Sequence, residues 1–183
     1  VVNGLSDCTS FQASYGTPIA SNLASWIDQV CSRHAGEPTV AMYECANEAS
    51  EGNSNIGPWY QAMAQRIKQR DPQALVGTGG GNNSGNPTTI AGWASGSAID
   101  LISYHDYYTP AGTLGPRSGV FNSAANTANK PWYMGERGFC CNGGNTGSLT
   151  TNGQRLKTEY GLSLSGSGNA SNCAGYLYWD FKL

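Results

Sequence analysis

The chain has 183 residues, 12% of them charged, and a formal net charge of -2 at pH 7. This length favours one domain with a sizeable core over a pair of domains. The ten Lys and Arg residues are scattered and no apolar run reaches the length of a membrane span, which argues against nucleic-acid binding and against insertion into a membrane.

Short apolar runs alternate with helix-like segments along the whole chain. The strands are expected at residues 1–5, 39–46, 75–78, 101–105, 132–135 and 175–181. The helices are expected between them, at residues 19–34, 58–69, 89–95, 121–128 and 153–163. This alternation is typical of parallel strands joined by crossover helices. Because a closed eight-stranded barrel needs about 250 residues, the sequence predicts an α/β fold with a shortened or incomplete (β/α) TIM-type barrel of about six parallel strands.

Six cysteines, an even number, accompany many Gly, Ser, Asn and Thr residues: Cys8, Cys31, Cys45, Cys140, Cys141 and Cys173. This combination is typical of proteins in an oxidising compartment, so we expect a secreted protein with disulfide bonds. None of the cysteines shows a CxxC or His-partnered spacing, and no metal site is expected.

The position of each cysteine in the strand and helix pattern restricts its partners. Cys31 and Cys173 both lie on the side of the fold opposite the strand ends, so they are expected to pair with each other if they pair at all. A bridge between Cys31 and Cys45 is not expected, because the two differ in height along the strands. The other cysteines are expected to pair among themselves, Cys8 or Cys45 with Cys140 or Cys141.

Two acidic residues close apolar runs of the chain. Glu48 follows the run 39–46, and Glu136 closes the run 131–135. An unpaired charge is costly in the core of a sheet, so both carboxylates are expected at its rim. Carboxylates at two strand ends can face one another across a groove. Glycoside hydrolysis needs such a pair of carboxylates.

The residues around these acids resemble the motifs of a known enzyme family. The segment 44–48, Glu-Cys-Ala-Asn-Glu, resembles the E-x-x-N-E signature that closes the fourth strand in retaining glycoside hydrolases of clan A, the cellulases, mannanases and related TIM-barrel enzymes. The segment 132–136 is similar to the seventh strand of that clan, 103–107 to its sixth-strand H-x-Y, and 178–179 to its eighth-strand aromatic. The first two strands of the clan have no counterpart, so the chain resembles a member shortened at its N-terminus.

The resemblance implies a role for each residue of the site. Glu48 would be the general acid and base, and Glu136 the nucleophile of a double displacement, with the two carboxyl groups about 5 to 5.5 Å apart. Asn47 would bind the sugar hydroxyl beside the reacting carbon, and His105 or Tyr107 would hold the nucleophile in place.

Other residues near these motifs have simpler interpretations. Trp179 is expected to stack on a sugar ring, whereas Trp93 and Trp132 are expected in the core. Glu44 shares a strand face with Glu48 and is expected to be a buried, hydrogen-bonded support. Arg137 follows Glu136, and neighbours on a strand point to opposite faces. The glycines at 79–81 are expected in a rim loop, since they lack the spacing of a phosphate-binding motif.

We therefore expect residues 1–183 to form a single catalytic domain of a secreted retaining glycosidase that needs no cofactor. It would hydrolyse O-glycosidic bonds in a β-linked polysaccharide, acting on the interior of that polysaccharide or on its oligosaccharides. The alternative is a catalytically silenced carbohydrate-binding relative. A Ser or Cys hydrolase is not indicated, because a G-x-S-x-G motif is absent. Open sheet edges at residues 1–5 and 175–181 could pair in a homodimer.

Overall fold

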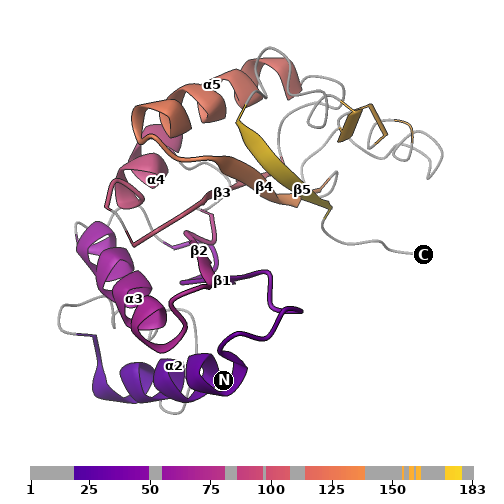
Figure 1. Ribbon diagram of the computed structural model, residues 1–183. Coiled ribbons are helices and arrows are strands. Elements are labelled where there is room, and N and C mark those ends of the chain that lie inside the picture. The colour runs from indigo at the N-terminus through magenta and orange to yellow at the C-terminus, as the bar shows by residue number, and fades with distance from the viewer. Residues whose placement is uncertain are drawn as a thin grey trace.

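The computed structural model describes residues 19–49, 55–80, 86–96, 98–107, 114–138, 154, 157–158, 160–161 and 172–178. The helices are α2 (Ser21–His34), α3 (Ile56–Arg70), α4 (Pro87–Trp93) and α5 (Leu114–Thr127). The strands are β1 (Met42–Glu44), β2 (Leu75–Gly77), β3 (Ile102–Asp106), β4 (Trp132–Arg137) and β5 (Cys173–Tyr178). The helices form an outer arc around the strands (Figure 1). The strand predicted at 1–5 lies outside the described residues, and between 154 and 161 the described residues are helical.

The strands are parallel and follow one another in chain order. β1 pairs with β2, β3 pairs with β4, and β4 pairs with β5. A parallel bridge between Gly77 and Leu101 joins β2 to the segment that enters β3, where the Leu101 amide also donates to the Val76 carbonyl at 3.2 Å. This sequential order is the winding of a barrel, whereas a doubly wound sheet reverses its order. The predicted α/β fold with part of a TIM-type barrel is confirmed.

The core lies between the helices and the strands. α3 begins two residues before Pro58, so this proline sits in the first turn, where no intrahelical partner is needed for its nitrogen. On β3, the Tyr104 ring stacks on Phe121 of α5 with ring centroids 4.3 Å apart, and it meets the buried Trp132 edge-on. Trp93 is also buried, so both tryptophans are core residues as predicted. No helix in the described ranges has the length and hydropathy to cross a membrane.

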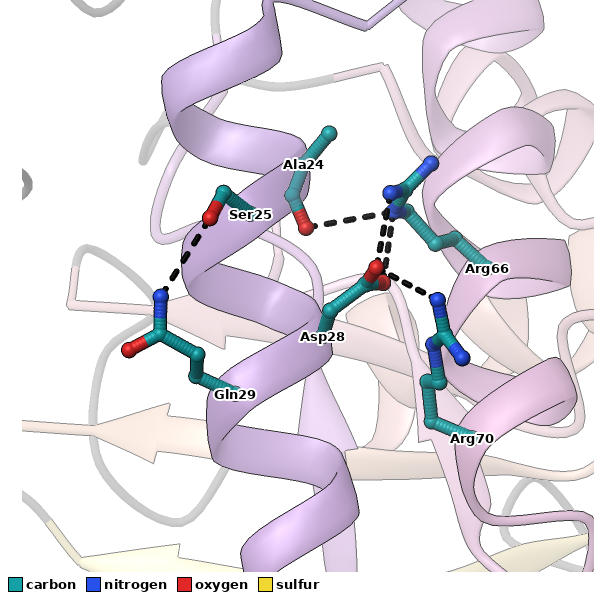
Figure 2. A network of polar contacts seen from close by, with 6 residues as sticks. All are labelled: Ala24, Ser25, Asp28, Gln29, Arg66 and Arg70. Carbon is teal, nitrogen blue, oxygen red and sulfur yellow. Dashed lines mark hydrogen bonds and ion pairs between the residues drawn. The ribbon is translucent and has the colours of Figure 1, made fainter.

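Helices α2 and α3 are joined by an ion-pair network around Asp28 (Figure 2). Arg66 donates from Nε to Oδ1 of Asp28 at 2.8 Å and from Nη2 to Oδ2 at 2.9 Å. Arg70 donates from Nη2 to Oδ2 at 2.6 Å, and Arg66 Nε also lies 3.1 Å from the Ala24 carbonyl. These hydrogen bonds, first from Arg70 and then from Arg66, lower the pKa of Asp28 from 3.8 to about 2.

Replacing Asp28 with Asn should lower the free energy of unfolding at neutral pH by about 1 kcal/mol or less, since solvent screens partly exposed ion pairs. The pKa of Asp28 is lower in the folded chain than its ordinary 3.8, so the stabilisation is present above that value and is lost as the pH falls toward about 2. Urea unfolding of both proteins across this pH range would measure the effect. A difference between the proteins that stays constant at every pH would contradict it.

The cysteines correct one prediction. Cys31, Cys45 and Cys173 are free thiols, so Cys31 and Cys173 do not pair, and the option that pairs Cys45 with Cys140 or Cys141 is wrong. The physical reason that Cys31 and Cys173 do not pair is the distance between them around the sheet. Cys31 lies on α2 and packs in the core near β1, whereas Cys173 begins β5 at the other end of the strand order. Burial raises the pKa of the Cys31 thiol to about 11. Cys8, Cys140 and Cys141 lie outside the described residues.

Candidate active site

The carboxyl ends of the parallel strands bring four of the predicted site residues together. Glu48 follows β1, His105 lies near the end of β3 with Tyr107 directly after it, and Glu136 lies near the end of β4. In barrels of this type the carboxyl ends of all strands meet at one face, and that face carries the active site. Residues 88 positions apart in the chain, Glu48 and Glu136, are therefore neighbours in space.

The two carboxylates lie beside the same nitrogen of the His105 imidazole. Nδ1 of His105 lies 3.0 Å from Oε1 of Glu48 and 3.6 Å from Oε2 of Glu136. These three atoms all lie within 4.8 Å of one another. The Tyr107 hydroxyl donates to Oε2 of Glu136. The His105 side chain is 1% exposed, whereas Glu48 and Glu136 keep 28% and 15% of their side-chain surface, so both acids remain open to a ligand.

A β-bulge in β4 sets the direction of Glu136. Tyr104 pairs with Met134 but His105 pairs with Glu136, so Gly135 is the extra residue on β4. A Cβ on Gly135 would lie 2.1 Å from Oγ of Ser103, so only glycine fits there. Bulges of this kind are frequent beside active sites, where they redirect a side chain. The extra residue brings Glu136 to the face of the sheet that carries His105.

We call this face the inner face: it carries Ser103, His105 and Tyr133 and is turned away from the helices. Arg137 belongs to the opposite side, as the alternation along a strand predicts. Its Nη1 donates to the Asp106 carbonyl oxygen at 2.9 Å and lies 3.9 Å from Oδ2 of the same residue. Both side chains are almost completely buried, so this pair ties β3 to β4 directly behind the site.

The loop after β2 supports the acid that follows β1. Glu48 has a φ of 46°, a conformation that residues other than glycine rarely adopt. Its amide donates to the Gly79 carbonyl at 3.1 Å. Gly79 itself has a φ of 76°, and a Cβ there would lie 1.5 Å from the Ala46 carbonyl oxygen. The close approach of these two backbones holds Glu48 in its uncommon conformation.

Gly80 supports the imidazole in the same way. Its φ is 74°, and a Cβ on it would lie 2.5 Å from Cδ2 of His105. The sequence pattern indicated only a rim loop for Gly79 and Gly80 and identified neither as a site residue. The signal that could have found them is a glycine pair placed directly after an apolar strand, at the end where the site lies.

The remaining predicted residues have different outcomes. Asn47 is exposed beside Glu48 at the end of β1. Trp179 lies outside the described residues, and its role stays a prediction. Glu44 was expected to be buried, and this is wrong: it is exposed on the inner face and accepts a hydrogen bond from the Tyr133 hydroxyl. Its side chain stands on β1, which among the described strands has a neighbour on one side alone, β2.

This arrangement can perform two-carboxylate chemistry. Glu48 and Glu136 approach closely and differ in their neighbours. Glu48 lies beside the His105 imidazole, and Glu136 lies beside both this imidazole and the Tyr107 phenol. Side chains so placed can divide the roles of proton donor and nucleophile. Among the described residues, the same group of Glu48, His105 and Glu136 could also hold a metal ion.

Comparisons with known proteins bear on the fold. Neither protein-family profiles nor curated protein sequences match the chain. An endo-1,4-β-mannanase from Rhizomucor miehei matches in structure with a TM-score of 0.67 and 16% identity, over 94% of this chain and 57% of that one. The catalytic domain of an endoglucanase from Thermobifida fusca matches with a TM-score of 0.61 and 20% identity, over 87% and 50%. The same endoglucanase in complex with cellotetraose has a TM-score of 0.59.

A glycoside hydrolase family 5 mannosidase from Rhizomucor miehei matches with a TM-score of 0.61 and 17% identity, over 85% of this chain and 45% of that one. The chain spans about half the length of these structures. At such identities the likeness shows the fold: the chain has part of the TIM barrel of family 5 cellulases and mannanases, which are glycosidases of clan A. The resemblance stated from the sequence motifs is confirmed at this level.

Proposed function

We propose that the chain is a retaining glycosidase whose residues 1–183 form a single catalytic domain. The observation that carries the proposal is the approach of Glu48 and Glu136, with one oxygen of each within 4.8 Å, at the carboxyl ends of barrel strands. Carboxyl groups about 5 to 5.5 Å apart are typical of retaining enzymes. An inverting pair needs about 6.5 to 9.5 Å, because a water molecule must fit between the acid and the sugar.

In the proposed first step, the Glu48 carboxyl donates its proton to the glycosidic oxygen while a Glu136 oxygen attacks the anomeric carbon. The bond between this carbon and the glycosidic oxygen breaks, the shortened glycan leaves as an alcohol, and a glycosyl ester forms on Glu136. In the second step, Glu48 takes a proton from water, and the water oxygen attacks the anomeric carbon. The ester bond breaks and Glu136 leaves as a carboxylate, so the anomeric configuration is retained.

His105 and Tyr107 would position the nucleophile. The Tyr107 hydroxyl donates to Oε2 of Glu136, which leaves the other oxygen for attack. Nδ1 of His105 lies close to both carboxylates, and a proton on this nitrogen would face the oxygens of both. Because the imidazole is buried and rests against Gly80, its orientation is restricted.

The similar folds support one class of substrate. The matching structures include an endo-1,4-β-mannanase and an endoglucanase, one of them in complex with cellotetraose. These names support an endo-acting enzyme on a β-linked polysaccharide or its oligosaccharides. Asn47, exposed beside Glu48, would bind a sugar hydroxyl, and Trp179 would stack on a sugar ring. We further propose that the protein is secreted, since such polymers lie outside the cell. A homodimer through the sheet edges stays a prediction.

The test is the release of reducing sugar from a panel of glucans, mannans and xylans by the native protein and by a Glu136→Gln variant. Proton NMR of the first product would give its anomeric configuration. Hydrolysis with retention by the native protein alone is the expected result. Products of inverted configuration would overturn the retaining assignment. Binding of a glycan without hydrolysis would instead support the alternative, a catalytically silenced carbohydrate-binding relative.

Replacing Gly80 with Ala should lower kcat by about 10- to 100-fold, because the new Cβ displaces the His105 ring from the two carboxylates. Gly36→Ala is a matched control: Gly36 has a similar φ of 73°, but no atom lies within 4 Å of the added Cβ. Both variants therefore carry the same backbone strain, and only Gly80→Ala moves the imidazole. Kinetics together with thermal unfolding would measure this. Equal activity of the two variants would contradict the role of Gly80.

A further inference from the structure

The two strands that carry the acids are not neighbours. Glu48 follows β1 and Glu136 lies on β4, with β2 and β3 between them. Backbone pairing sets the distance between adjacent strands only. The distance between β1 and β4 also depends on the curvature of the sheet. A contact across the inner face could therefore control how closely the two carboxylates approach.

One side-chain contact crosses this span. The hydroxyl of Tyr133, on β4, donates to Oε1 of Glu44, on β1. Burial and the nearby Glu44 carboxylate raise the pKa of Tyr133, so the hydroxyl keeps its proton and remains a donor. On β2, Gly77 pairs in register with Glu44, and a Cβ on Gly77 would lie 2.8 Å from Oη of Tyr133. The absence of a side chain at Gly77 leaves room for the tyrosine to reach β1.

This contact lies below the acids on the strands that lead to them. Tyr133 precedes Glu136 by three residues on β4, and Glu44, the last residue of β1, precedes Glu48 by four. The hydrogen bond from the buried Tyr133 phenol to the Glu44 carboxylate is charge-assisted. Such hydrogen bonds are roughly twice as strong as those between two neutral groups.

We propose that the Tyr133–Glu44 hydrogen bond sets the separation of Glu48 and Glu136, so that Tyr133 and Glu44 are positioning residues for the reaction. The inference rests on the proposed glycosidase function. Without the bond, the link between β1 and β4 runs through β2 and β3, and a flatter sheet would increase the separation of the two acids beyond what the first step requires. Neither residue touches the reacting atoms.

Tyr133→Phe removes only the hydroxyl and keeps the ring. We expect kcat to fall by about 10- to 100-fold while KM changes by less than about two-fold, because misplacement of reacting groups acts on the chemical step. Glu44→Gln should retain most of the activity, since its amide oxygen still accepts from Tyr133.

Tyr43→Phe is the matched control. Tyr43 stands beside Glu44 on β1, and its buried hydroxyl has no hydrogen-bond partner in the part of the chain that the structure describes. This variant also loses one hydroxyl oxygen from the two strands concerned, and its kcat and KM should equal those of the native protein. A merely structural role of Tyr133 would lower thermal stability in Tyr133→Phe and leave the kcat of the folded protein unchanged, which would overturn the proposal.

A measurement without substrate separates this inference from the proposed function. In crystal structures without substrate, the Glu48 and Glu136 carboxyl groups should lie further apart in Tyr133→Phe than in the native protein. If the native protein hydrolyses no glycan, the proposed function fails, and the crystal structures still test the positioning. An unchanged separation in Tyr133→Phe would overturn the positioning role even if the native protein is an active glycosidase.

Discussion

Replacing Glu136 with Ala should lower kcat by about 10⁴-fold or more, the scale on which removal of a nucleophile acts. The fold should survive, because Glu136 keeps 15% of its side-chain surface exposed at the rim of the sheet. Kinetics with an aryl β-glycoside and with a soluble polysaccharide would measure the loss, and circular dichroism would check the fold. Glu37→Gln is a control, since this carboxylate is exposed in the loop after α2.

A small anion can then identify the role of each acid. In Glu136→Ala, azide can enter the space of the lost carboxylate and attack the anomeric carbon once, which should give a glycosyl azide of inverted configuration. In Glu48→Ala the covalent step on Glu136 is kept, so azide should give a product of retained configuration. The opposite pattern in the two variants would show that the assigned roles of Glu48 and Glu136 are exchanged.

Replacing Arg137 with Met should lower the free energy of unfolding by about 3 to 5 kcal/mol, the cost of removing one member of a buried ion pair. Arg137 is completely buried, and the Asp106 side chain is 1% exposed, so Asp106 would lose the guanidinium that faces it. The loss is large against the roughly 5 to 15 kcal/mol that stabilises most domains. Urea unfolding would measure it.

A double variant makes this prediction sharper. Arg137→Met with Asp106→Asn removes both charges, so it should be more stable than Arg137→Met alone, because it also removes the buried charge that faced Arg137. A loss below about 1 kcal/mol in Arg137→Met would show that the pair contributes no more than an exposed one.

The sequence by itself determined the local elements, although the observed strand bounds differ from the expected ones by up to three residues. Alternating apolar and helix-like segments predicted β1 to β5, because each element buries a face of its own residues. The start of α5 was missed by seven residues, at 121 instead of Leu114, although Pro116 fits the first turn of a helix. The motifs around Glu48 and Glu136 located both acids. Alternation along β4 also predicted that Arg137 faces away from the site.

Only the tertiary structure decided how residues on different strands meet. The bulge at Gly135 and the approach of Gly79 to Ala46 arise from contacts between segments far apart in the chain, and no local periodicity encodes them. The same reason explains why Cys31 and Cys173 do not pair. Similar height along the strands says nothing about distance around an open sheet. That distance depends on the curvature summed over every strand pair, as does the approach of Glu48 to Glu136.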